Sequence, residues 1–163
     1  MANPIKVKIH GSGSKILQKL ERFNPKGQPT LVAGVLGGAT RNEGEGQQSV
    51  ATYAYWNEYG TETIPARPFM RNAVNAHLSE WTAHIANYLK QGATPREALE
   101  MIKTLVRADI MASIKSDGFA PLSKKTIRRK ERRGSNTPEK PLQDTQALLR
   151  SINAEIRDGN ESS

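Results

Sequence analysis

The strongest constraint on the fold is a pair of long apolar periodicities joined by a short break. Apolar side chains in residues 68–91 recur every three to four positions, which is typical of one buried helix face. Gly92 ends this pattern. The segment "TPRE" restarts it, with Thr94 as N-cap and Glu97 in position to close a capping box. A second apolar stripe then runs as far as Asp117, so the two helices are predicted to pack as an antiparallel hairpin.

Shorter segments with strand character flank this helix pair. Residues 5–10 alternate apolar and polar side chains, and a helix is predicted over residues 12–23. Residues 31–36, "LVAGVL", are predicted to form a more buried strand, and an extended piece through Ile156 is predicted to add an edge strand. The chain is therefore predicted to be α+β: a small, mostly antiparallel sheet packed on one face by two long antiparallel helices.

One domain over residues 1–156 is predicted, because a chain of 163 residues can bury its own core and neither a repeat nor a linker divides it. Two polar segments rich in helix breakers, residues 37–48 and 131–143, are predicted to be extended, flexible arms. The first is either a long β-hairpin or a partner-contacting loop. Residues 157–163 are predicted to be a frayed tail.

Two short helices are predicted in the last third of the chain. Ser123 is placed to cap a helix that has few apolar contacts and is marginal on its own. Asp144 or Thr145 is placed to cap a second helix, which runs through Leu148 and Ile152.

The side chains that carry most enzyme chemistry are missing or scattered. The chain has no cysteine, which excludes disulfides, thiol catalysis and cysteine-based metal sites. His77 and His84 share a helix face but lie about 10 Å apart along its axis, too far for one metal ion. His10 has no recognisable partner, and the glycine-rich residues 37–48 lack the lysine of a phosphate-binding loop. The sequence predicts no enzyme, no cofactor and no metal site, and it contains no apolar run long enough to span a membrane.

Positive charge is concentrated in one segment. The net charge is +8, and residues 123–133 hold seven basic residues and one acidic residue, which is +6 of that total. Such a patch attracts polyanions, although a solvated helix face beside acidic neighbours has the same composition. Aromatic residues lie elsewhere, which disfavours sequence-specific binding of nucleic acid and leaves contact with its backbone. The candidate polyanion contacts are Lys124, Lys125, Arg128, Arg129, Lys130, Arg132 and Arg133.

A proline-bounded corner, in "YWNEYGTETIPARPFM", precedes the first long helix. Pro65 and Pro68 fix the backbone on both sides of Arg67, and Pro68 suits the first helical position. The segment is therefore predicted to be a stiff elbow that presents Arg67 beside an exposed loop, with Glu58 as its ion-pair partner, and that buries Phe69. The alternative is a well-made connection between helices with no further role.

This corner and a later block resemble a family of tailed-bacteriophage proteins. "YAYWNEYGTETIPARPFMRNAV" is similar to the signature of tail-component and virion-morphogenesis proteins, in which an alanine–aromatic–x–Glu–aromatic–Gly run precedes Pro-x-Arg-Pro-Phe. "FAPLSKKTIRRK" followed by "KPLQDTQALLRSI" agrees with the same family in order and spacing. Gln146 replaces the family's usual glycine, which favours a regular helix start over a left-handed turn. The matching positions are Trp56, Glu58, Tyr59, Gly60, Pro65, Arg67, Pro68, Phe69, Pro121, Leu122, Thr126, Lys130, Lys140, Pro141, Leu142, Asp144, Thr145, Leu148 and Ile152.

The resemblance implies a structural virion protein that completes the tail or joins it to the head in the neck. It implies a ring, six-fold or twelve-fold, that contacts other neck, tail-tube or connector proteins and is assembled in the bacterial host cytoplasm. The matching residues are then interface and structural positions, the two arms reach neighbouring protomers, and the elbow holds the angle between subunits. The alternatives are a tail terminator capping the tail tube, a head-completion factor, and a basic DNA-binding module using residues 123–133.

Overall fold

The computed structural model describes residues 29–36, 40–43, 46–143 and 146–158. The strand expected over residues 5–10 and the helix expected over residues 12–23 lie outside this range. The elements are β1 (Thr30–Val35), β2 (Thr40–Glu43), β3 (Gly46–Ser49), α2 (Val50–Tyr59), α3 (Phe69–Lys90), α4 (Pro95–Lys115), α5 (Lys124–Arg132), α6 (Ala147–Ser151) and β4 (Ile152–Arg157). The predicted α+β class, with antiparallel strands packed against long helices, is confirmed.

The two strands that pack on the helices come from opposite ends of the described chain. β1 pairs with β4 in antiparallel register, which sets Leu31 opposite Ile156 and Val35 opposite Ile152. Alternate side chains of a strand lie on one face, so these pairs give the sheet one continuous apolar face. The strand predicted through Ile156 is confirmed.

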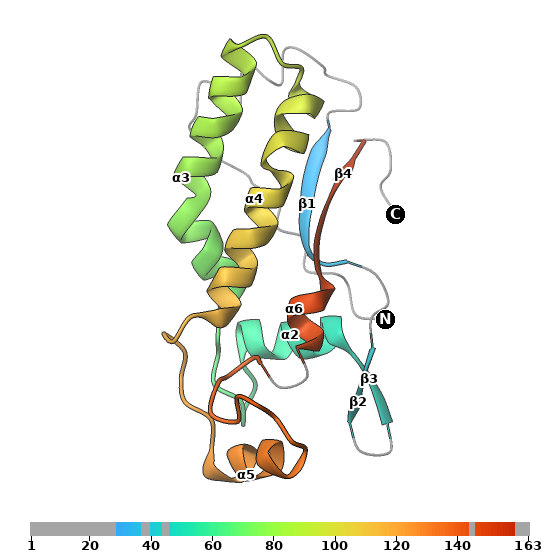
Figure 1. Ribbon diagram of the computed structural model, residues 1–163, viewed down its shortest axis with the longest axis vertical. Coiled ribbons are helices and arrows are strands. Elements are labelled where there is room, and N and C mark those ends of the chain that lie inside the picture. Colours follow the sequence, from blue (N-terminus) through green and yellow to red (C-terminus); the bar gives the residue numbers. More distant parts are fainter. Residues whose placement is uncertain (1–28, 37–39, 44–45, 144–145, 159–163) are drawn as a thin grey trace.

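A second antiparallel pair forms a separate hairpin. β2 pairs with β3, with Thr40 opposite Ser49 and Glu43 opposite Gly46. In Figure 1 this hairpin projects away from the long helices, beside α2. The described part of residues 37–48 is therefore the β-hairpin that was one of the two predicted alternatives.

The long helices form the predicted antiparallel hairpin. α4 contacts α3 on one side and both β1 and β4 on the other, so it forms the centre of the fold (Figure 1). The Thr94 backbone N–H donates to Glu97 Oε2 at 2.7 Å and the Glu97 N–H donates to the Thr94 hydroxyl at 3.3 Å, which completes the predicted capping box. The hydrogen bond from the Thr94 backbone, followed by that from its side chain, lowers the pKa of Glu97. None of the helices in the described ranges combines the length and apolarity of a membrane span.

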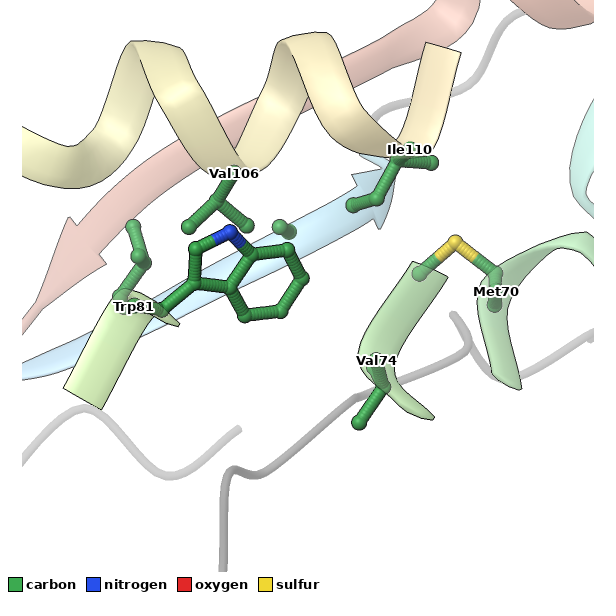
Figure 2. Close-up of a pocket in the computed structure, with 7 residues that line it drawn as sticks. Met70, Val74, Trp81, Val106 and Ile110 are labelled. Atoms are coloured by element: carbon green, nitrogen blue, oxygen red, sulfur yellow. The ribbon is translucent and has the colours of Figure 1, made fainter. Parts of the chain in front are cut away.

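Trp81 occupies the centre of the contact between the helices and the sheet. It is buried, and its indole N–H donates to the Asp109 carboxylate at 2.7 Å. Figure 2 shows the ring reaching from α3 towards Val106 and Ile110 of α4. The small apolar cavity beside it, of about 10 Å³, is lined by Leu31, Ala33, Met70, Val74, Trp81, Val106 and Ile110 and has room for about one water.

The segment after α5 differs from the flexible arm predicted over residues 131–143. The Thr137 hydroxyl donates to the Gln143 carbonyl at 3.0 Å, and the Lys140 N–H donates to the Thr137 carbonyl at 3.2 Å. Leu142 is buried at a positive φ of 64°. These bonds fold the segment back on itself, because its polar groups find partners within the chain.

The expectation of a regular helix start at Gln146 is wrong. Gln146 has φ 56° and ψ 9°, which is the left-handed region, and α6 begins one residue later. The burial of Leu148 and Leu149 offsets the backbone strain, so the turn keeps its shape without glycine. The predicted caps Asp144 and Thr145 lie outside the described residues.

Gln146→Gly is expected to stabilise the protein. A left-handed conformation costs a non-glycine residue about 1–2 kcal/mol, while glycine loses about 0.5–1 kcal/mol of extra chain entropy, so the gain is roughly 0.5–1 kcal/mol. Urea unfolding followed by circular dichroism measures it. Gln91→Gly is the matched control: Gln91 has φ −79°, so the same change should lower stability. A lower unfolding midpoint for Gln146→Gly would contradict the strain.

Candidate functional site

The elbow between α2 and α3 begins at a glycine that no other residue can replace without strain. Gly60 has φ 79°, and its N–H donates to the Trp56 carbonyl at 2.8 Å, which ends α2. A Cβ at this position would lie 3.0 Å from both the Ala66 nitrogen and the Ile64 oxygen. The backbone therefore turns tightly here because the residue has no side chain.

Glu58, a residue of α2, accepts hydrogen bonds from the start of α3. Its side chain is buried, and the carboxylate accepts the backbone N–H of Met70 at 2.9 Å and of Arg71 at 3.1 Å. Pro68 was predicted to be the first residue of the helix. It is the N-cap instead, and α3 begins at Phe69. A proline side chain caps nothing, so the carboxylate of Glu58 takes over the cap and also complements the positive end of the helix dipole.

The ion-pair partner of Glu58 is Arg71, and the predicted pair with Arg67 is wrong. Arg71 donates from Nε to Glu58 Oε1 at 3.0 Å and from Nη2 to the Glu58 carbonyl at 2.5 Å. Arg71 lies in the first turn of α3, directly over the carboxylate, whereas Arg67 points to another segment. The Arg71 guanidinium also lies 5.0 Å from the ring centroid of Tyr59.

Arg67 is directed inward rather than presented beside a loop as predicted. It is 4% exposed, and its guanidinium donates to the carbonyls of Ala120 at 3.1 Å and Pro121 at 3.4 Å and to Asn57 Oδ1 at 3.4 Å. Desolvation lowers the pKa of Arg67, with an opposing effect from Tyr53. An arginine stays protonated even so, and the buried charge is stabilised by neutral oxygen atoms.

The elbow therefore joins the two blocks of the family resemblance. The first block contributes Arg67 and the fully buried Phe69, whose burial was predicted, and the second contributes the carbonyls of Ala120 and Pro121. The Ser113 hydroxyl donates to the Phe69 carbonyl at 2.7 Å, which ties the end of α4 to the start of α3. Among the other matching residues, Leu142, Leu148 and Ile152 are buried, Trp56, Pro68, Leu122, Thr126, Lys140 and Pro141 are half-buried, and Tyr59, Pro65 and Pro121 are exposed.

Lys130 is structural, so its assignment as a polyanion contact is wrong. It is 3% exposed, and its ammonium donates to the carbonyls of Thr137 at 2.9 Å and Lys140 at 2.7 Å. Its position on the inner face of α5 explains the burial. The other predicted contacts are exposed: Lys124, Lys125, Arg128, Arg129, Arg132 and Arg133. The predicted cap of this helix is confirmed, because the Ser123 hydroxyl accepts the Thr126 N–H at 3.2 Å.

Three residues that the sequence did not single out complete the site. Asn57 is buried and donates to the Tyr53 carbonyl at 2.9 Å while accepting from Arg67. Tyr55 and Arg71 belong to the exposed surface around Tyr59, with the two tyrosine rings 4.8 Å apart. The spacing of the tyrosines, four residues apart on a helix, was the available signal.

Within the described ranges, no group of three side chains could hold a metal ion. His77 and His84 both lie near Glu80, with ring-nitrogen to carboxylate distances of 3.2 and 3.8 Å, and His10 lies outside the described residues. Comparison with protein-family models, curated proteins and solved structures gives no match to this chain.

Glu58→Gln is expected to lower the free energy of unfolding by roughly 2 kcal/mol. The amide removes the negative charge and one of the acceptor oxygens that serve α3 and Arg71, and hydrogen bonds to charged groups contribute about 1.5–3 kcal/mol. Chemical denaturation measures the change. The control is Glu62→Gln, an exposed acid in the same elbow, which should change stability by less than about 0.5 kcal/mol. Equal effects of the two variants would argue against the capping role.

Arg67→Ala is expected to destabilise the folded protein by roughly 3 kcal/mol, because it leaves buried oxygen atoms without a donor. Arg67→Lys should recover only part of the loss, since one ammonium cannot reproduce the planar fork that reaches Asn57, Ala120 and Pro121. Thermal and urea unfolding measure both variants, with the exposed Arg150→Ala as control. An unfolding midpoint of Arg67→Ala equal to that of Arg150→Ala would contradict a stabilising role for Arg67.

Proposed function

We propose that this chain is a structural subunit of a tailed-phage virion, which forms a ring at the head–tail junction and completes the tail or neck. The observation that carries the proposal is the clamp between the two blocks of the family resemblance. Arg67 of the first block is buried against the carbonyls of Ala120 and Pro121 of the second. Residues far apart in the chain thus act as one structural unit, which supports their interpretation as a single family motif.

The rigidity of the elbow supports a role in a ring. A closed ring needs a constant angle between subunits, because a small error repeated at each contact prevents closure. Glu58 fixes α3 relative to α2, and Arg67 fixes the chain before α5 relative to both. With Gly60 and two prolines in the connection, little backbone freedom is left to vary that angle.

An exposed aromatic surface beside the elbow supplies a contact between protomers. Tyr55 and Tyr59 are each 51% exposed, and Arg71 lies over the ring of Tyr59. Tyrosine and arginine are enriched among the residues that dominate binding energy at protein interfaces. Because Glu58 already holds Arg71, the surface is ordered before binding and loses little entropy on contact. The β2–β3 hairpin projects from the other end of α2 (Figure 1).

In this proposal the protein is a virion component, assembled in the host cytoplasm, whose partners are its own copies and the neck, tail-tube or connector proteins. A terminator that caps the tail tube is the alternative in the same class. The two differ in attachment: a terminator ring binds isolated tail tubes, whereas a neck ring also binds the head connector.

Electron microscopy of the purified protein, alone and mixed with tails, tests the proposal together with sedimentation velocity at increasing concentration. We expect closed rings of six-fold or twelve-fold symmetry. The double variant Tyr55→Ser/Tyr59→Ser should sediment as a smaller species at the same concentration and keep the wild-type unfolding midpoint, because both rings are largely exposed.

The matched control is Met101→Ser, which alters a similarly exposed apolar side chain of α4, outside the elbow. It should assemble as the wild type does. Assembly of the tyrosine variant at the wild-type concentration would refute the assigned contact, and a wild-type protein that stays monomeric alone and with tails would refute the ring.

A further inference from the structure

The exposed cations of α5 are gathered on one side of the helix. Successive residues are rotated by about 100°, so the five cations of the helix itself fall within an arc of roughly 140°. They are Lys124, Lys125, Arg128, Arg129 and Arg132, and all are exposed. The opposite side carries the half-buried Thr126 and Ile127 and the buried Lys130. Glu131, the one acid of α5, is also exposed and lies at the edge of this arc. The helix thus has an inner, structural side and an outer side on which five cations face one acid.

Glu131 is the one acid on the helix, so this charge has little compensation in the described part of the chain. The ion pairs there involve none of the five cations, and the first turn of α5 contains no acid. Lys124 and Arg128, Lys125 and Arg129, and Arg128 and Arg132 are each four residues apart, where like charges repel. Lysines at the helix N-terminus also oppose the dipole. A helix that accumulates so many local penalties is consistent with a site that an anion completes.

The chain nevertheless holds α5 firmly in place. Arg67 binds the carbonyls of Ala120 and Pro121 just before the helix, and Lys130 binds the carbonyls of Thr137 and Lys140 just after it. Two buried cations, Arg67 and Lys130, thus hold the helix that carries the exposed cations. In Figure 1, α5 lies at one end of the molecule, away from α3, α4 and the sheet, so its outer side is open to a large partner.

We propose that the outer side of α5 binds duplex DNA through its phosphates, without reading the base sequence. Duplex DNA carries one charge per about 1.7 Å of its axis, so a helix of nine residues, about 13 Å long, can meet several phosphates at once. The segment Lys124–Arg132 contains no aromatic side chain to stack on bases, which favours a duplex backbone over a single strand. This inference does not rest on the proposed ring.

Fluorescence anisotropy with a labelled duplex of about 30 base pairs tests the site. Five phosphate contacts predict a slope of about −4.5 for log affinity against log salt concentration, or about a 500-fold loss between 50 and 200 mM salt. The variant Arg128→Gln/Arg129→Gln/Arg132→Gln should reduce the slope to about −1.8. It should fold at least as well as the wild type, because it removes like-charge repulsion.

The matched control is Lys90→Gln/Arg96→Gln/Lys103→Gln, which removes the same net charge from α3 and α4, outside α5. It should keep the wild-type slope. Two duplexes of unrelated sequence should bind within about two-fold of each other. Equal slopes for both triple variants, a ten-fold preference between the duplexes, or equal affinity for a polyglutamate peptide of matched charge would each overturn the proposal.

Discussion

The buried carboxylate of Glu58 is the interaction on which the rest of the structure depends. α3 begins immediately after a proline, whose side chain cannot cap it, and the first N–H groups of a helix need acceptors. Glu58 supplies them from the previous helix and is itself balanced by Arg71. The direction of α3 is therefore fixed from α2, and α4, which carries the sheet on its other side, packs against a helix whose start is already set.

Backbone carbonyl groups contact the other two buried cations of the site. Arg67 and Lys130 each donate to two backbone carbonyls in segments that have no regular secondary structure. Such segments have unpaired acceptors to offer, and a cation satisfies several of them with one side chain. The two loops around α5 are thus ordered by charge–dipole contacts, although few apolar side chains are available there.

Sequence patterns predicted the parts of the fold that depend on neighbours within one turn or one strand. The Thr94–Glu97 capping box and the Ser123 cap both follow from local chemistry. The predicted ion-pair partner of Glu58 was wrong because Arg67 and Arg71 are four residues apart, and only the packing decides which of them faces the carboxylate. The burial of Lys130 was missed because a run of like residues hides which of them points inward.

Gln146 illustrates a different limit. The family resemblance expects a glycine at this position, and glycine signals a left-handed backbone. Glutamine as a residue type favours an ordinary helix start. Gln146 nevertheless has the left-handed conformation that is typical of glycine. The position in the motif was a better guide to the backbone than the residue that occupies it.

The junction between the β2–β3 hairpin and α2 has a mechanical consequence. β3 ends at Ser49 and α2 begins at Val50, with no linker between them, and Val50 is completely buried. A bound partner that displaces the hairpin would therefore rotate α2 with it. Glu58 lies at the far end of α2 and binds the first turn of α3, so this rotation would also move α3. The position of the hairpin is therefore coupled to that of the long helices.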